Sequence, residues 1–144
     1  MAGASLNITI DDRELRALLQ RLQARLSDLT PVFRDMGEHL LNSTRARFQS
    51  QTDPSGLPWA PLSPTYQARK RKNKGKILTL EGRLRGLLNY QVSQDALRVG
   101  TPLIYGATHQ FGDPRRNIPA RPFLGLSAAD RNDLLDILND YLAR

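Results

Sequence analysis

The stretch DDRELRALLQRLQARLSDLT, residues 11–30, carries the clearest structural pattern of this sequence. Its leucines recur at steps of three and four residues, which places them on one face of an α-helix. The repeating positions are Leu15, Leu18, Leu19, Leu22, Leu26 and Leu29. Asp11 and Asp12 precede them and offer an N-cap. A helix with one apolar face needs a partner to cover that face, so the stretch predicts a layered domain.

A second amphipathic helix follows directly. Thr30 and Pro31 are predicted to be its N-cap and first helical residue, because a proline at that position loses no hydrogen bond. The helix is expected to continue to about Gln51, with its apolar stripe formed by Val32, Phe33, Met36, Leu40, Leu41 and Phe48. Arg45 and Arg47 are expected to lie on its other faces.

The C-terminal stretch predicts a third amphipathic helix. Ser127 and Asp130 resemble a capping box at its start. Asp130, Asp133 and Asp136 are expected along its polar side, where they need no catalytic explanation. The apolar positions of this helix are Leu134, Leu135, Ile137, Leu138, Tyr141 and Leu142.

Two regions alternate apolar and polar residues, as is typical of β-strands. Residues 6–10, LNITI, form the first. Residues 90–92 and 97–99 form the second, and we predict that they pair as a β-hairpin ending at Gly100. The pattern predicts an α+β fold, in which helices from the N- and C-terminal parts of the chain cover a small, mainly antiparallel β-sheet. The length suits one domain, residues 1–144.

A proline-rich and basic loop region is predicted at residues 52–76. Its first part, TDPSGLPWAPLSP at residues 52–64, contains four prolines and a glycine, which excludes regular structure over most of its length. Trp59 and Leu62 are too apolar to remain in water, so we expect them to anchor this loop to the core.

Several short elements are expected after this anchor. Residues 63–64, Ser-Pro, can open a short helix. Thr79 is predicted to cap a further helix through residues 80–88, where leucines recur at helical spacing. Residues 104–110 predict a helical turn, and residues 118–124 are expected to be extended because they contain two prolines.

The charge of the chain is strongly positive and unevenly placed. The formal net charge is +7 and the sequence pI is near 10.4, which favours polyanions or acidic protein surfaces as partners. Residues 63–86 hold eight basic residues and a single acidic one, Glu81. We expect contacts with DNA phosphates or with an acidic neighbouring subunit from Arg69, Lys70, Arg71, Lys72, Lys74 and Lys76. The alternative is that this segment is a solvated loop.

No constellation in the sequence predicts catalysis, so we expect no enzyme, no cofactor and no metal. The absence of cysteine excludes thiolate ligands and thiol nucleophiles. His39 and His109 lack partners at metal-ligand spacing, and no glycine pattern fits a phosphate-binding loop. There is neither a leader pattern nor an apolar run of about 18 residues, so we expect no membrane contact and a protein kept in the cytoplasm.

Unusual residues follow one another in a distinctive order between residues 51 and 125. The series comprises Gln51, Pro54, Gly56, Trp59, Pro61, Leu62, Ile77, Leu78, Thr79, Gly82, Leu84, Val99, Gly100, Thr101, Tyr105, Gly106, the run from His109 to Gly112 and the run from Ile118 to Gly125. It resembles the phage virion morphogenesis family, the tail-completion proteins of Mu-like and P2-like bacteriophages. The N-terminal helices agree with that family only in general character.

The resemblance implies a structural role without catalytic residues, in which the protein finishes the head-proximal end of the tail, or the neck, so that head and tail can join. The family-motif residues are Trp59, Pro61, Thr79, Gly82, Tyr105, His109, Gln110, Phe111, Gly112, Pro119, Arg121, Pro122, Phe123 and Leu124. Among them, Phe111 is interpreted as an apolar plug, Phe123 and Leu124 as core anchors, and Arg121 as a donor to buried carbonyls or carboxylates. Gly106 stands where Ala is expected.

A junction protein must match the symmetry of the tail or neck, so the resemblance also implies a ring of copies with head-to-tail contacts. Sixfold symmetry is the first expectation and twelvefold the second. Further expected partners are tail-tube or neck and connector proteins, and phage DNA in the lumen facing residues 69–76. The expected location is the host cytoplasm during assembly and the head-tail junction of the virion afterwards. The rival function is a basic DNA-binding domain that is not part of the particle.

Overall fold

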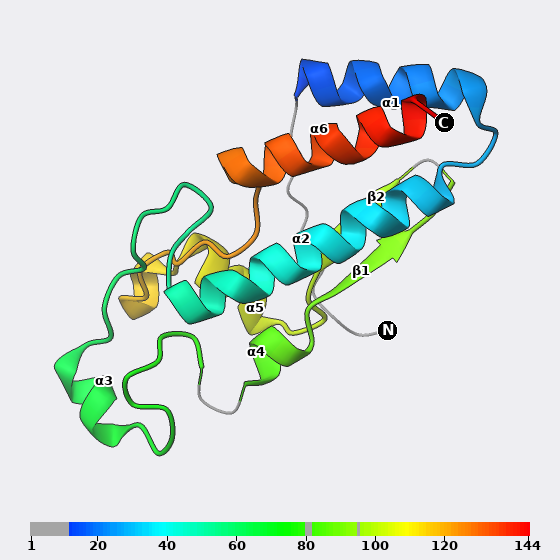
Figure 1. The fold of residues 1–144 in the computed structure, drawn as a ribbon. Helices are drawn as coiled ribbons and strands as arrows, with labels where there is room; N and C mark the ends of the chain where they lie inside the picture. The colour runs from blue at the N-terminus through cyan, green and yellow to red at the C-terminus, as the bar shows by residue number, and fades with distance from the viewer. Residues whose placement is uncertain (1–11, 80–81, 95) are drawn as a thin grey trace.

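Three helices form the main layer of the protein (Figure 1). The computed structural model describes residues 12–79, 82–94 and 96–144, so the strand predicted at residues 6–10 lies outside the described residues. Helix α1 spans Arg13–Arg25, α2 spans Thr30–Ser50 and α6 spans Ala128–Leu142. Helix α6 packs against both α1 and α2, which brings the first and the last described helices together.

Helix α1 begins as predicted but ends earlier. Asp12 is its N-cap and accepts hydrogen bonds from the backbone N–H groups of Glu14 and Leu15, at 3.1 and 3.2 Å. The helix ends at Arg25, and Leu26 adopts an extended backbone conformation. The predicted continuation to Leu29 is therefore wrong, although Leu29 is buried in the same core as the helical leucines.

The start of α2 differs from the prediction by one residue. Thr30 is the first helical residue and does not cap the helix with its side chain. Its backbone N–H and its hydroxyl both donate to the carboxylate of Asp28, at 2.9 and 2.6 Å. This local Asp28 turn competes with helix, which explains why the leucine pattern stops being helical before residue 29. Helix α2 ends at Ser50, as expected, with Gln51 in the left-handed region.

The hairpin is confirmed. Strand β1, Asn89–Val92, pairs antiparallel with β2, Leu97–Gly100, and Tyr90 lies opposite Val99. Both strands pack against α2. Gly37 of α2 makes this close approach possible, because a Cβ there would lie 2.6 Å from the Tyr90 ring. The α+β prediction is confirmed, with α2 as the helix that contacts both strands and α6 packed on the other helices.

Two apolar clusters form the core. The first lies between α1, α2 and α6. The second lies under the loops and contains Leu41, Phe48, Trp59, Leu84, Leu88, Phe123 and Leu124. Helix α2 contributes residues to both clusters, so one continuous helix connects them.

The remaining elements are short and border the second cluster. They are α3 (Pro64–Arg69), α4 (Arg83–Gly86), α5 (Tyr105–Phe111) and the 3₁₀ turn η1 (Pro114–Arg116). Ser63 caps α3 as predicted, since its hydroxyl accepts from the backbone N–H of Tyr66 at 3.2 Å. The helix does not run through the basic segment, because it ends at Arg69. Among the described residues, no helix is both long and apolar enough to cross a membrane.

The prediction that Thr79 caps a helix is wrong. Its hydroxyl donates to the carbonyl of Ile77 at 3.3 Å, and α4 begins only at Arg83. Gly82 precedes α4 with φ 74°, a left-handed conformation that separates Thr79 from the helix. Of the predicted helical stretch 80–88, residues 80 and 81 lie outside the described residues.

Candidate functional site

The site is built on the extended segment from Pro119 to Leu124, which two side chains tie to the proline-rich loop. Arg121 donates from Nε to the carbonyl of Ala60 at 2.7 Å and from Nη2 to that of Pro61 at 2.9 Å. The indole N–H of Trp59 donates to the carbonyl of Pro122 at 2.7 Å. Trp59 is buried, as predicted, and its ring packs edge-on against Phe48 at 5.3 Å between ring centroids.

Gln110 holds the other side of the segment. Its Oε1 accepts from the backbone N–H groups of Phe123 and Leu124, both at 3.0 Å, and its Nε2 donates to the carbonyl of Leu124 at 3.0 Å. One buried side chain thus pairs three buried backbone groups. Phe123 and Leu124 enter the second core cluster, as expected.

Phe111 does not act as a plug. It is 62% exposed at the end of α5, whereas the neighbouring Gln110 points into the protein. The turn after it requires glycine, because Gly112 has φ 76° and a Cβ there would lie 2.7 Å from the backbone nitrogen of Ala120. The predicted turn at Gly112 is therefore confirmed, whereas the predicted inward position of Phe111 is wrong.

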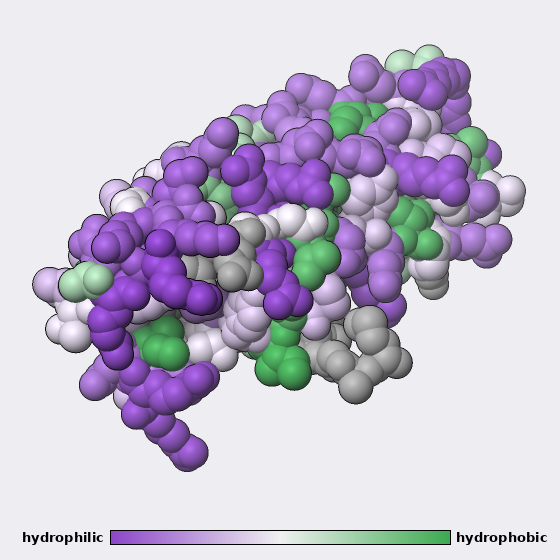
Figure 2. Space-filling model, turned by 90° about the horizontal axis from the view of Figure 1, so that it is seen from below, coloured by the Kyte–Doolittle hydropathy of each residue, from purple (hydrophilic) through white to green (hydrophobic). Residues whose placement is uncertain are grey.

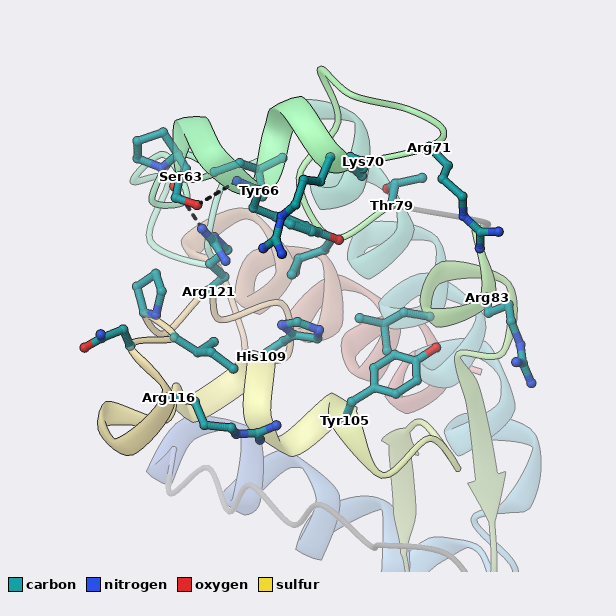
Figure 3. Close-up of a pocket in the computed structure, with 18 residues that line it drawn as sticks. Ser63, Tyr66, Lys70, Arg71, Thr79, Arg83, Tyr105, His109, Arg116 and Arg121 are labelled. Atoms are coloured by element: carbon teal, nitrogen blue, oxygen red, sulfur yellow. Dashed lines mark hydrogen bonds between the residues drawn. The ribbon is translucent and has the colours of Figure 1, made fainter.

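We call residues 69–76 the basic loop and the segment from Pro119 to Leu124 the braced segment. A cleft of about 940 Å³ opens between them (Figure 3). One side is formed by α3 and the residues that follow it, including Tyr66, Arg69 and Lys70. The opposite side is formed by α5, through Tyr105 and His109, and by residues 116–119 and 121. Five cations besides Lys70 line the cleft: Arg69, Arg71, Arg83, Arg116 and Arg121. Apolar lining comes from Pro61, Leu62, Leu78, Leu84, Ile118 and Pro119.

The predicted basic contact residues separate into two groups. Lys70 is only 5% exposed, and its ammonium donates to the carbonyl of Asn73 at 2.7 Å and to that of Lys76. Burial lowers its pKa. Lys70 therefore holds residues 70–76 in a closed turn from the buried side. The other members, Arg69, Arg71, Lys72, Lys74 and Lys76, are exposed at the surface.

The second buried cation of the cleft is Arg121, which is 7% exposed. Burial lowers its pKa, and the phenol of Tyr66 opposes that shift. Its hydrogen bonds go to neutral carbonyls, so Arg121 resembles Lys70 in lacking a carboxylate partner among the described residues.

His109 lies beside these cations in a half-buried position. Its Nδ1 is buried without a hydrogen-bond partner in the described structure. Burial lowers its pKa, and the charges of Arg121 and Arg116 lower it further. The Tyr105 ring packs edge-on against it at 5.8 Å. Within residues 12–79, 82–94 and 96–144, no group of three His, Asp or Glu side chains could hold a metal ion.

A buried ion pair behind the cleft was missed by the sequence reasoning. Arg47 lies inside the protein, bonded to the Asp130 carboxylate and, at 2.8 Å, to the carbonyl of Phe123. Its predicted place on an outer face is wrong, as is the place of Asp130 on the polar side of α6. The sequence does indicate that Arg47 faces inward, because it follows Met36, Leu40 and Thr44 at helical spacing on the buried face of α2. The capping box of Asp130 with Ser127 is confirmed.

Comparison with known proteins places the chain in a family. A profile described as the phage virion morphogenesis family matches residues 10–143. The chain belongs to this family. It is 33% identical to the putative capsid assembly protein G of Escherichia phage Mu, over 92% of this chain and 91% of that protein. It is also 29% identical to the Mu-like prophage FluMu G protein 1 of Haemophilus influenzae, over 83% of this chain and 84% of that protein. No solved structure matches it significantly.

Four residues of the ordered series lie together in the structure. Trp59, Gln110 and Gly112 contact backbone groups of the segment from Ile118 to Leu124. Arg121 lies in that segment and donates to carbonyls of the proline-rich loop. The motif thus shapes one wall of the cleft. A role in phage assembly follows from the family, and the chemistry of the cleft is that of cations set around apolar surface.

Proposed function

We propose that this family member acts at the head-tail junction of the phage particle, as a tail-completion, tail-terminator or neck component needed to join heads to tails. The observation that carries the proposal is the family match over residues 10–143. The relative in phage Mu, named as a putative capsid assembly protein, supports a role in building the particle. The braced wall and the cationic cleft supply a rigid shape with charge, which is what binding between particle components requires.

Loss of the gene tests this function. In the phage or prophage that carries it, a nonsense mutation should leave complete heads and complete tails that remain separate in electron micrographs. Supplying the wild-type protein from a plasmid should restore joined, infectious particles. Normal particles without the protein, or a failure to form heads at all, would contradict a role at the junction.

A ring is the expected assembled form, because the junction surrounds an axis. We expect closed rings with heterologous contacts, sixfold in the first instance and twelvefold in the second. The neighbouring tail-tube or connector proteins are the expected partners, with phage DNA in the lumen. Native mass measurement with negative-stain imaging of the purified protein gives the copy number directly.

The rival function is a basic DNA-binding domain outside the particle, and the cationic cleft is the observation in its favour. Such a domain should bind duplex DNA with an affinity that falls steeply as salt rises. A junction component should instead associate with itself or with tail parts in the absence of DNA. Binding and assembly assays on the same preparation separate the two.

A further inference from the structure

Among the residues that the structure describes, the cleft contains buried positive charge without a matching negative charge. Lys70 and Arg121 are both more than nine-tenths buried and bond to backbone carbonyls. Arg69 and Arg83 line the same cleft at the surface, without an ion pair in the described part of the chain. The described residues that line it include no aspartate or glutamate.

Such an arrangement favours an anionic ligand. A buried cation loses much of its hydration, and neutral carbonyls replace only part of it. Carboxylates that enter the cleft would compensate the positive charge of the two buried cations, Lys70 and Arg121. They would also compensate the charge of the surface arginines Arg69 and Arg83. The lowered pKa of Lys70 agrees with this loss of hydration.

The shape of the cleft favours protein over duplex DNA. Its volume of about 940 Å³ is that of a small-molecule or side-chain site, and apolar side chains such as Leu62, Leu78 and Ile118 form part of the lining. A DNA duplex is a wide rod that presents phosphates along its outside, and it binds cations on a raised or open surface. Figure 2 shows hydrophilic side chains at the end of the molecule that carries α3, with patches of apolar surface between them.

A complementary surface exists on the same chain. Asp133, Asp136 and Asp140 are all exposed on α6, and their spacing of three and four residues places them on one face. Asp133 lies 3.4 Å from Nε2 of His39, whereas Asp136 and Asp140 form no ion pair in the described structure. Asp35 of α2 lies beside the end of this face, where its carboxylate accepts from the Tyr141 hydroxyl.

The two surfaces lie in different parts of the molecule. Helix α6 belongs to the three-helix layer, whereas α3 and the basic loop form the opposite end (Figure 1). One copy therefore does not place its own acidic face in its own cleft. Two different patches that fit each other form a heterologous contact, and repetition of such a contact closes a ring when the rotation permits.

We infer that the cationic cleft receives the acidic face of α6, Asp133, Asp136 and Asp140, from a second copy of this chain. This inference rests on the proposed junction function, because it supplies the contact between neighbours in the ring. The apolar part of the cleft adds contact area, and the charges fix which face of the neighbour enters.

Charge reversal tests the contact. One variant carries Arg69→Glu and Arg83→Glu, which spares the buried Lys70 and Arg121. The other carries Asp133→Lys, Asp136→Lys and Asp140→Lys. Each variant alone should associate at least about tenfold more weakly than the wild type in sedimentation velocity at low salt, because like charges then face each other. A control with Arg21→Glu and Arg98→Glu, two exposed cations outside both surfaces, should associate normally.

Restoration is the decisive measurement. An equal mixture of the two variants should form rings in which they alternate. Each acidic, reversed cleft then meets a basic, reversed α6, and each native cleft meets a native α6. A single chain that carries all five changes should also regain association. Circular dichroism should show that every variant is folded.

Other outcomes overturn the inference. Both variants could assemble like the wild type, or the wild type could stay monomeric at its highest soluble concentration. Alternatively, the cleft variant could lose binding to a short DNA duplex while the α6 variant assembles normally, which would assign the cleft to nucleic acid. The junction function is tested separately by the nonsense mutant, so separate heads and tails there would retain that function even if the charge pairing fails.

Discussion

Gly106 stands where the resemblance to the family predicts alanine, and the side chain of Thr101 fills the space beside it. A Cβ at Gly106 would lie 2.5 Å from the methyl carbon of Thr101, so the threonine methyl occupies the space of an alanine side chain. Both residues are buried beside the second core cluster. The two positions should therefore vary together.

We predict that Gly106→Ala lowers the free energy of unfolding by about 1–3 kcal/mol, because overpacking outweighs the gain in helix propensity. Urea denaturation measures the change. Adding Thr101→Ser removes the methyl group and should restore most of the loss. Gly86→Ala is the matched control, since a Cβ there meets nothing within 4 Å. A Gly106→Ala protein as stable as the wild type would refute this packing account.

Gln110 is the other single residue with a large expected effect. Gln110→Leu keeps the size of the side chain but leaves the N–H groups of Phe123 and Leu124 and the carbonyl of Leu124 without their partner. Each buried group left unpaired costs about 1–3 kcal/mol. The variant should unfold at much lower urea, while Gln23→Leu, an exposed change on α1, should have little effect. Equal midpoints for the two variants would contradict the assigned role.

At the scale of elements, the Arg47–Asp130 pair joins α2 to the start of α6. Asp130 also accepts from the Ser43 hydroxyl and caps α6 through the backbone N–H of Ser127. Burial raises the pKa of Asp130, but these hydrogen bonds and the Arg47 charge together bring it below the usual value of 3.8. The folded state therefore favours the carboxylate form.

We predict that Asp130→Asn destabilises the protein by about 3–5 kcal/mol at pH 7, because Arg47 is left as a buried cation without its counter-ion. A group with a lowered folded-state pKa adds stability above its unfolded pKa and loses that contribution as pH falls through the lower folded value. The difference between wild type and variant should therefore be complete above pH 3.8 and shrink below it. Urea titrations at a series of pH values measure this, and a difference that is independent of acid pH would refute it.

Strongly periodic elements could be predicted from the sequence, and short ones could not. The leucine pattern located α1 and the apolar stripe located α2 and α6, because a buried helical face imposes its own spacing. The ends were decided by local polar groups, as the Asp28 turn before α2 shows. Thr79 was misassigned because a left-handed Gly82 stands between it and α4.

At the scale of the whole molecule, the cleft could be predicted only in part. The excess of basic residues at 63–86 indicates a cationic surface, and four of these residues line the cleft: Arg69, Lys70, Arg71 and Arg83. The inward direction of Lys70 could not be read from a run of similar residues, because it depends on the carbonyls of Asn73 and Lys76. The opposite wall comes from residues 105–121, and its approach to the proline-rich loop before α3 depends on the tertiary contacts of Arg121 with Ala60 and Pro61.

The whole-molecule arrangement also predicts one unfolding transition for the single domain expected from the length. Trp59, the sole tryptophan, reports on the second core cluster, whereas far-ultraviolet circular dichroism reports mainly on the three long helices. Because α2 belongs to both clusters, fluorescence and dichroism should give superimposable urea curves. Two separated transitions would show that the clusters unfold independently.

Helix α2 passes without interruption through both clusters, and this bears on the proposed assembly of a particle from many copies. Leu41 and Phe48 of the second cluster lie on the same helix as Val32 and Met36 of the first, so an ordered leucine layer also places residues against which the loops pack. In the proposed junction role, each subunit would then join its neighbours as one folded unit. A ring of the proposed kind could not close with a half-folded member, and a helix shared by both clusters would guard each polypeptide against that error.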